Sequence, residues 1–133
     1  MSDASLAEVM ERHPELNVFG IGVSSPWSKS AQDRDIELAQ GRAELAERES
    51  KVYETVAWLR DNLRPIQTPS QGSYQLKHLA EKSDLGYISN GELIAAAFIV
   101  GYHYRYDRPN VLFGVRALDI RRLTAERQEA DRA

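Results

Sequence analysis

The chain has 133 residues, 42% of them hydrophobic and 28% charged, and a formal net charge of −3 at pH 7, which indicates one structural domain with a hydrophobic core. It contains no cysteine, which excludes disulfides, thiol nucleophiles and thiolate metal sites and is typical of the cytoplasm. The apolar runs are too short to span a bilayer and the acidic N-terminus does not resemble a secretory signal, so we expect no membrane association.

Residues 1–30 predict a short N-terminal helix, a strand and a loop. The helical pattern of residues 5–11 ends before Pro14, because proline disfavours helical geometry in the residue before it. The apolar run at 17–23 predicts a strand. The segment that follows, with Pro26 and Trp27, predicts a loop.

Residues 31–65 predict a long amphipathic helix. Apolar side chains recur every seven residues along it, at Leu38, Leu45 and Val52. Gly41 weakens the pattern and Glu49 falls on the apolar face, so the alternative is a helix with a break. An unbroken helix of this length exceeds the diameter of a compact domain. We therefore expect the apolar stripe either to pack within the chain or to form the seam of a homodimer through the same three residues.

Residues 66–117 predict a core unit made of a helix, a turn, a buried helix and a strand. The first helix covers residues 74–83 and is followed by a turn at Gly86. Ser89 and Glu92 have the spacing of a capping box, in which each side chain satisfies a backbone N–H at the start of a helix. The helix that begins there, up to residue 102, is apolar on nearly every side, which predicts burial.

The remaining segments complete the predicted fold. Residues 110–115 predict a strand, which we expect to pair with the strand at 17–23. Residues 118–133 predict a charged C-terminal helix or tail. The fold class is thus α+β and predominantly helical, with a compact helical core and a small two- or three-stranded antiparallel sheet in one structural domain.

The strongest surface pattern is the alternation of aromatic and basic residues at 103–108, which the sequence places at the exit from the buried helix. Such residues are enriched in protein interfaces and also stack on bases and bind phosphates. The structural alternative is a helix exit with solvated arginines. The pattern favours a protein interface. The expected partner-binding residues are Tyr74, Lys77, His78, Tyr102, His103, Tyr104, Arg105, Tyr106 and Arg108.

Nucleic-acid binding is the second candidate. Its expected contact residues are Lys77, Arg105, Arg108, Arg116, Arg121 and Arg122. Residues 51–133 carry twelve Lys/Arg and ten Asp/Glu, a weaker basic bias than nucleic-acid-binding domains usually show. Residues 72–101 have the outline of a helix-turn-helix unit, but the turn is long and the second helix has too few polar side chains to read a groove.

Catalytic and metal-binding patterns are incomplete in this sequence. His13, His78 and His103 are the candidate general bases, and the motifs of phosphate-binding loops, nucleophile elbows and paired-histidine zinc sites are missing. The run Gly20-Ile21-Gly22 lacks the rest of a dinucleotide-binding fingerprint. We therefore expect a protein that is not an enzyme, without catalytic residues, cofactor or metal ion.

Four segments in order resemble a group of small uncharacterised bacterial, phage and plasmid proteins. They are Ile66-Gln67-Thr68-Pro69, Ser73-Tyr74-x-Leu76-Lys77-His78-x-Ala80-Glu81, Tyr87-Ile88-Ser89-Asn90-Gly91-x-Leu93-Ile94-Ala95-Ala96-Ala97 and Pro109-Asn110-x-x-Phe113. The resemblance covers about residues 56–115 and implies an accessory protein of a mobile element, with no catalytic residue carried over. It implies action by binding, either to a host protein of defence or replication as an inhibitor or modulator, or to DNA as a regulator.

The acidic first half suggests a further contact surface. Residues 1–50 hold five Lys/Arg and ten Asp/Glu, a balance of −5. Within residues 31–47, the first half of the long helix, the acidic residues are Asp33, Asp35, Glu37, Glu44 and Glu47. We expect them to face solvent or to meet a basic surface of a partner.

Overall fold

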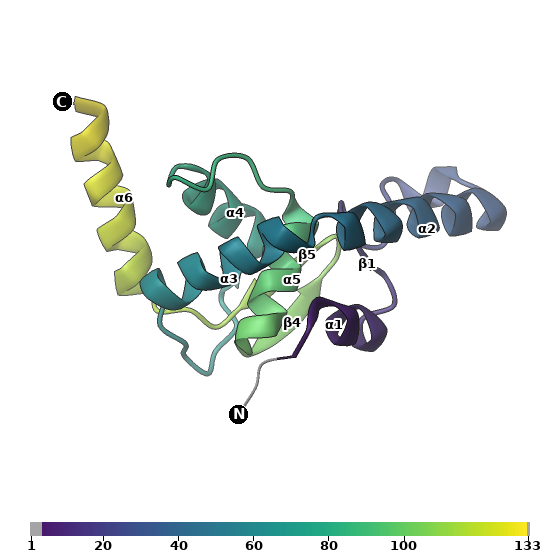
Figure 1. The fold of residues 1–133 in the computed structure, drawn as a ribbon, viewed down its shortest axis with the longest axis horizontal. Helices are drawn as coiled ribbons and strands as arrows, with labels where there is room; N and C mark the ends of the chain where they lie inside the picture. Colours follow the sequence, from purple (N-terminus) through teal and green to yellow (C-terminus); the bar gives the residue numbers. More distant parts are fainter. Residues whose placement is uncertain (1–3, 133) are drawn as a thin grey trace.

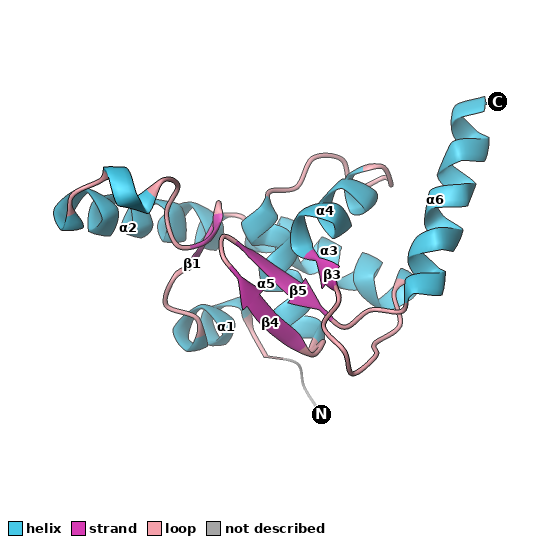
Figure 2. Cartoon of the chain, turned by 180° about the vertical axis from the view of Figure 1, so that it is seen from behind, coloured by secondary structure: helices cyan, strands magenta, loops and turns pink. Residues whose placement is uncertain are grey.

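The computed structural model describes residues 4–132, and these adopt a predominantly helical α+β fold (Figures 1 and 2), which confirms the predicted fold class. The helices are α1 (Leu6–Arg12), α2 (Ala31–Glu47), α3 (Glu49–Asn62), α4 (Ser73–Glu81), α5 (Asn90–Val100) and α6 (Ala117–Arg132), with a 3-10 turn at Pro26–Ser28. The strands are β1 (Leu16–Asn17), β2 (Gly20–Ile21), β3 (Gln71–Gly72), β4 (Tyr104–Asp107) and β5 (Asn110–Phe113). None of the helices in this part of the chain is both long and apolar enough to cross a bilayer.

Helix α5 lies at the centre of the fold, as the sequence predicts. Its residues 93–97 are fully buried, and α1, α3 and α4 all pack against it (Figure 1). The predicted capping box is confirmed: the Glu92 N–H donates to the Ser89 hydroxyl, and the Ser89 N–H donates to the Glu92 carboxylate (2.9 Å). The helix ends at Gly101, whose positive φ of 93° suits glycine.

The sheet differs from the prediction. The segments 17–23 and 110–115 do not form a two-stranded pair, because β5 lies between β3 and β4 in an antiparallel sheet of order β3-β5-β4 (Figure 2). Residues 16–21 instead form a tight hairpin of β1 and β2, because the Asn17 amide donates to three backbone carbonyls that enclose its turn, those of Glu15, Gly20 and Gly22. Strand β4 occupies the segment predicted as a helix exit.

The long helix is broken at Arg48 into α2 and α3, which follow each other along the long axis of the molecule (Figure 1). Leu45 and Val52 are fully buried in the core of the same chain. Side chains buried within the chain are not available to a subunit seam, so the predicted homodimer contact through Leu38, Leu45 and Val52 is wrong for Leu45 and Val52. Leu38 is half-buried. Leu45 is the only buried residue of α2, and the N-terminal half of this helix projects from the fold.

Helix α1 and the β1–β2 hairpin, together called the N-terminal layer, cover one face of α5. The Gly91 N–H donates to the Val18 carbonyl (3.1 Å), and the Val18 N–H donates to the Gly41 carbonyl (3.1 Å). The Arg42 guanidinium donates to three more carbonyls of this layer, those of Met10, His13 and Leu16, at 2.8–3.0 Å. The face of α5 that a helix-turn-helix protein would offer to DNA is therefore covered by protein.

Asp119 anchors α6 to the end of α3. Its buried carboxylate accepts the Arg64 N–H (2.9 Å) and an N–H of the Arg116 guanidinium (2.5 Å). The hydrogen bond from Arg116 lowers the pKa of Asp119, although burial alone would raise it. A carboxyl with a lowered folded pKa contributes stability that is complete above its unfolded pKa and is lost as the pH falls through the folded pKa.

Replacing this carboxylate gives a pH-dependent prediction. Asp119→Asn is expected to lower the free energy of unfolding at pH 7 by about 2 kcal/mol, since it loses charge-assisted hydrogen bonds. The difference from wild type should shrink below the ordinary aspartate pKa of about 3.9. Urea unfolding across this pH range measures both effects, with the exposed Asp131→Asn as control. A difference that stays constant with pH would contradict the role of the Asp119 charge.

Candidate partner-binding site

Two adjoining clefts form an aromatic groove on one side of the molecule. The first, of about 560 Å³, lies between the β1–β2 hairpin, the 3-10 turn and α2. The second, of about 450 Å³, lies between the hairpin turn, α4 and the turn between β4 and β5. Phe19 and Pro109 line both clefts, so the two lie next to each other. The groove carries the exposed aromatic side chains Trp27 (85% exposed), Tyr87 (68%), Tyr74 (55%) and Phe19 (42%).

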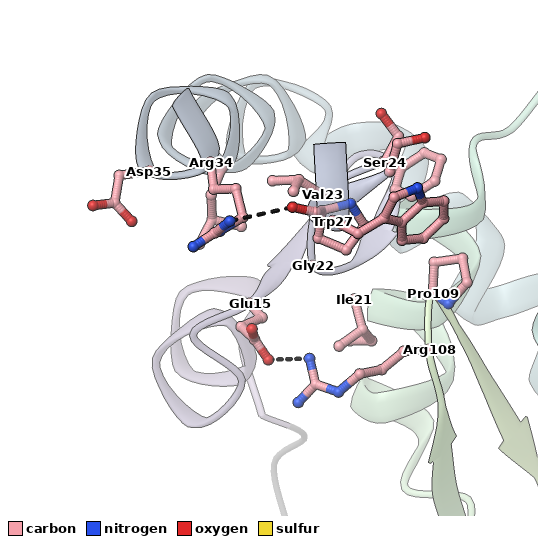
Figure 3. A pocket seen from close by; sticks show the side chains of 14 residues that line it. Glu15, Ile21, Gly22, Val23, Ser24, Trp27, Arg34, Asp35, Arg108 and Pro109 are labelled. Carbon is pink, nitrogen blue, oxygen red and sulfur yellow. Dashed lines mark hydrogen bonds and ion pairs between the residues drawn. The ribbon is translucent and has the colours of Figure 1, made fainter. Parts of the chain in front are cut away.

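The first cleft is open and mixed in character (Figure 3). Trp27 and Pro109 lie on one side of it, and Arg34 and Asp35 extend from α2 on the other. An ion pair between Glu15 and Arg108 lies at its lower end in this view. An apolar surface framed by charged groups is the usual composition of a protein-binding site.

Trp27 is held on an ordered loop. The Ser28 hydroxyl donates to the Ser25 carbonyl (2.9 Å), and the Arg34 guanidinium donates to the carbonyls of Pro26 (3.2 Å) and Lys29 (2.7 Å). These bonds fix the backbone on both sides of the indole, which is itself 85% exposed. A rigid loop that presents a tryptophan to solvent lowers the entropy lost on binding.

The second cleft is bordered by two tyrosines that share a lysine. The Lys77 ammonium lies 5.8 Å from the ring centre of Tyr74 and 5.1 Å from that of Tyr87, and it donates to the Glu81 carboxylate (2.9 Å). Burial alone would raise the pKa of Glu81, but the hydrogen bonds from Lys77 and the Ile88 N–H lower it. The ionised carboxylate thus holds the lysine between the two rings.

The structure separates the predicted partner-binding residues into three groups. Tyr74, Lys77 and His78 lie on α4, where the imidazole of His78 is 3.2 Å from Glu81. Tyr102 is buried, and its hydroxyl lies within hydrogen-bond distance of the Leu59 carbonyl (3.1 Å) in α3 and the Leu63 carbonyl (2.6 Å) just after it, so its prediction as a surface contact is wrong. The third group is exposed and lies along β4 and its ends, namely His103, Tyr104, Arg105, Tyr106 and Arg108. Of these, Arg108 lines the first cleft, and none lines the second cleft beside α4.

Strand β4 carries a cluster of aromatic rings. The His13 imidazole stacks on Phe98 with ring centres 3.9 Å apart, and its Nδ1 lies 2.5 Å from the Tyr106 hydroxyl. Burial lowers the pKa of His13 and raises the pKa of Tyr106. Both shifts favour the neutral forms. His13, one of the candidate bases, is therefore a packing residue that joins α1 to α5 and β4.

Most of the cations expected to contact nucleic acid are paired with carboxylates. Lys77 pairs with Glu81, Arg108 with Glu15, Arg116 with Asp119, and Arg122 with both Asp119 and Glu126. The other two expected cations, Arg105 and Arg121, are exposed, and neither forms an ion pair with a carboxylate of the described residues. Paired cations offer little net charge to a phosphate backbone, so these residues do not form a basic surface.

Three exposed aromatic residues of the groove lie outside the sequence-based prediction, namely Phe19, Trp27 and Tyr87. The available signal is weak: each is a large aromatic residue beside turn-forming residues, where burial in a regular element is not expected.

Within residues 4–132, no group of three or more His, Cys, Asp and Glu side chains has the geometry of a metal site. Comparison with protein-family models, curated proteins and solved structures found no match to the chain.

Proposed function

We propose that this chain is a non-catalytic accessory protein that binds a protein partner through the aromatic groove. The observation that carries the proposal is the exposure of Trp27, Tyr74, Tyr87 and Phe19 around two adjoining clefts. Tryptophan and tyrosine are the residues most enriched among those that dominate binding energy in protein interfaces. Exposed apolar surface of this kind is otherwise unfavourable in a folded chain.

The charges beside the groove indicate the chemistry of the partner. Asp35 lines the first cleft, and Asp33 lies on the same exposed half of α2. Neither carboxylate makes an ion pair with another described residue. A segment with apolar or aromatic side chains next to lysine or arginine would fill the clefts and complement these carboxylates. Such a partner agrees with the expectation that the acidic residues of α2 meet a basic surface.

The resemblance of residues 56–115 to proteins of mobile elements suggests the setting. We propose a host protein as the partner, with modulation or inhibition of host defence or replication machinery as the result of binding. Nucleic-acid binding is the less favoured function, because most candidate cations are already paired.

Substitution of Trp27 tests the groove. Tagged wild-type protein and Trp27→Ala are used to capture proteins from nuclease-treated bacterial lysate, with Leu118→Ala as control because Leu118 is also an exposed apolar residue but lies on α6. We expect a protein that wild type and the control retain and Trp27→Ala loses, with the affinity for the purified partner reduced about tenfold or more. Equal capture by all three proteins would exclude the groove, and capture of nucleic acid alone without nuclease would favour the second candidate.

A further inference from the structure

The outer edge of β4 is unpaired. In the sheet order β3-β5-β4, β4 is bonded to β5 on one side only, and all four of its residues are exposed. Within residues 4–132, no other segment forms a backbone hydrogen bond with the outer edge of this strand. The edge of a sheet is a template for the addition of another strand.

The hydrogen bonds of β5 show which backbone groups of β4 point outward. Val111, opposite Tyr106, donates its N–H to the Ser73 hydroxyl (3.1 Å). Phe113, opposite Tyr104, accepts the Ser70 N–H at its carbonyl (3.2 Å). Both residues of β5 thus direct backbone groups away from β4. Because directions alternate along an antiparallel ladder, the N–H and C=O groups of Tyr104 and Tyr106 point to the free edge.

The side chains of β4 carry complementary charges. The rings of Tyr104 and Tyr106 pack beside His13, so Arg105 and Asp107 lie on the opposite face of the strand. Arg105 and Asp107 are exposed, and their neighbours across the ladder, Leu112 and Asn110, are uncharged. Neither forms an ion pair with another residue of the described chain. The edge therefore presents an unpaired cation and an unpaired anion on either side of Tyr106.

We propose that β4 pairs antiparallel with β4 of a second copy of this chain, around a two-fold axis at Tyr106. In this register the Tyr106 backbones bond to each other, and Arg105 lies opposite the second copy's Asp107 on both sides of the axis. An axis at Arg105 would place two arginines opposite each other, which is unfavourable. The register is therefore selected by charge, and the two sheets become continuous. This surface differs from the aromatic groove, and the inference does not rest on the proposed function.

Charge exchange within β4 tests the proposal. Sedimentation of the full chain from low micromolar to several hundred micromolar should show a monomer–dimer equilibrium. Arg105→Asp and Asp107→Arg each place like charges opposite each other in the dimer, and each is expected to weaken association about tenfold or more. The double variant Arg105→Asp/Asp107→Arg restores both ion pairs and should return the dissociation constant to within about threefold of wild type.

A mixture of the two single variants gives the sharpest result. The edge of the Arg105→Asp chain carries two carboxylates, and the edge of the Asp107→Arg chain carries two guanidinium groups. The mixture should therefore form a heterodimer more readily than either variant alone forms a homodimer. Arg121→Asp, at an exposed arginine of α6, is the control and should associate like wild type. A wild-type monomer over the whole range would overturn the proposal, as would a dimer that both single variants leave intact or a mixture that fails to associate.

Discussion

Gly91→Ala is expected to lower the free energy of unfolding by about 3 kcal/mol or more. A Cβ at this position would lie 1.9 Å from the Asn17 carbonyl oxygen and 2.8 Å from the carbonyl carbon of Val18, both of them backbone atoms of the N-terminal layer. Such atoms cannot turn aside as a flexible side chain does, so the layer must separate from α5. Alanine alone would favour the helix by about 0.5–1 kcal/mol, and the predicted loss is therefore opposite in sign to helix propensity.

Urea unfolding followed by circular dichroism measures this effect, with Gly72→Ala as the control. A Cβ at Gly72 would have its nearest neighbour at 4.0 Å, and φ there is −72°, so a change below about 1 kcal/mol is expected. Amide hydrogen exchange should also accelerate in the N-terminal layer of Gly91→Ala. Wild-type stability and exchange in this variant would mean that the layer does not pack on α5 as described.

Leu45→Glu is expected to destabilise the chain by more than about 4 kcal/mol, enough to unfold much of a marginally stable domain. Leu45 is fully buried in the core, where a carboxylate would have to be desolvated without a partner. Its place near the end of α2 joins the projecting helix to the rest of the fold. The variant should therefore unfold and not merely lose association.

The matched control for Leu45→Glu is Ile36→Glu, which places the same carboxylate on the same helix. Ile36 is 48% exposed, so its substitution is expected to change stability by less than about 0.5 kcal/mol. Thermal unfolding and sedimentation of both variants separate the two possibilities. A folded Leu45→Glu chain of reduced oligomeric state would restore the stripe as a subunit contact.

The parts of the fold that could be predicted from the sequence depend on neighbouring residues. The start of α5 follows from Ser89 and Glu92, whose capping bonds span only three positions. Its burial follows from an apolar composition that leaves no face for solvent. The sequence allows a break in the long helix but does not place it, because Gly41 and Glu49 each favour a break and the helix is interrupted at Arg48.

The strands could not be placed from local pattern. The apolar run at 17–23 predicts one continuous strand, but the Asn17 amide donates to carbonyls before and after it and closes a turn directly after β1. The strand at Tyr104–Asp107 exists because it pairs with β5, and its exposed side chains show no burial pattern. The turn-forming residue Pro109 after alternating residues is the signal for this hairpin.

The candidate site could be predicted only in part. Tyr74 and Lys77 both belong to the helix that the sequence predicts at residues 74–83, so local pattern places them close together. Phe19 and Trp27 come from segments more distant in sequence, and only the docking of the N-terminal layer brings them to the same groove. The burial of Tyr102 could not be predicted, because the local sequence around a tyrosine at a helix end does not show whether its hydroxyl faces solvent or a buried carbonyl.

The groove crosses the junction between two parts of the chain. Phe19 and Trp27 precede α2, whereas Tyr74, Tyr87 and Pro109 belong to residues 66–117. A ligand that bridges this junction binds only the closed arrangement, so its binding free energy adds to the free energy that opposes local opening. If the two parts of the chain separate more often, the apparent affinity of the groove for its ligand falls in proportion to the fraction of molecules that are closed. As occupancy of the groove rises, the amide hydrogens of residues 6–21 will therefore exchange more slowly.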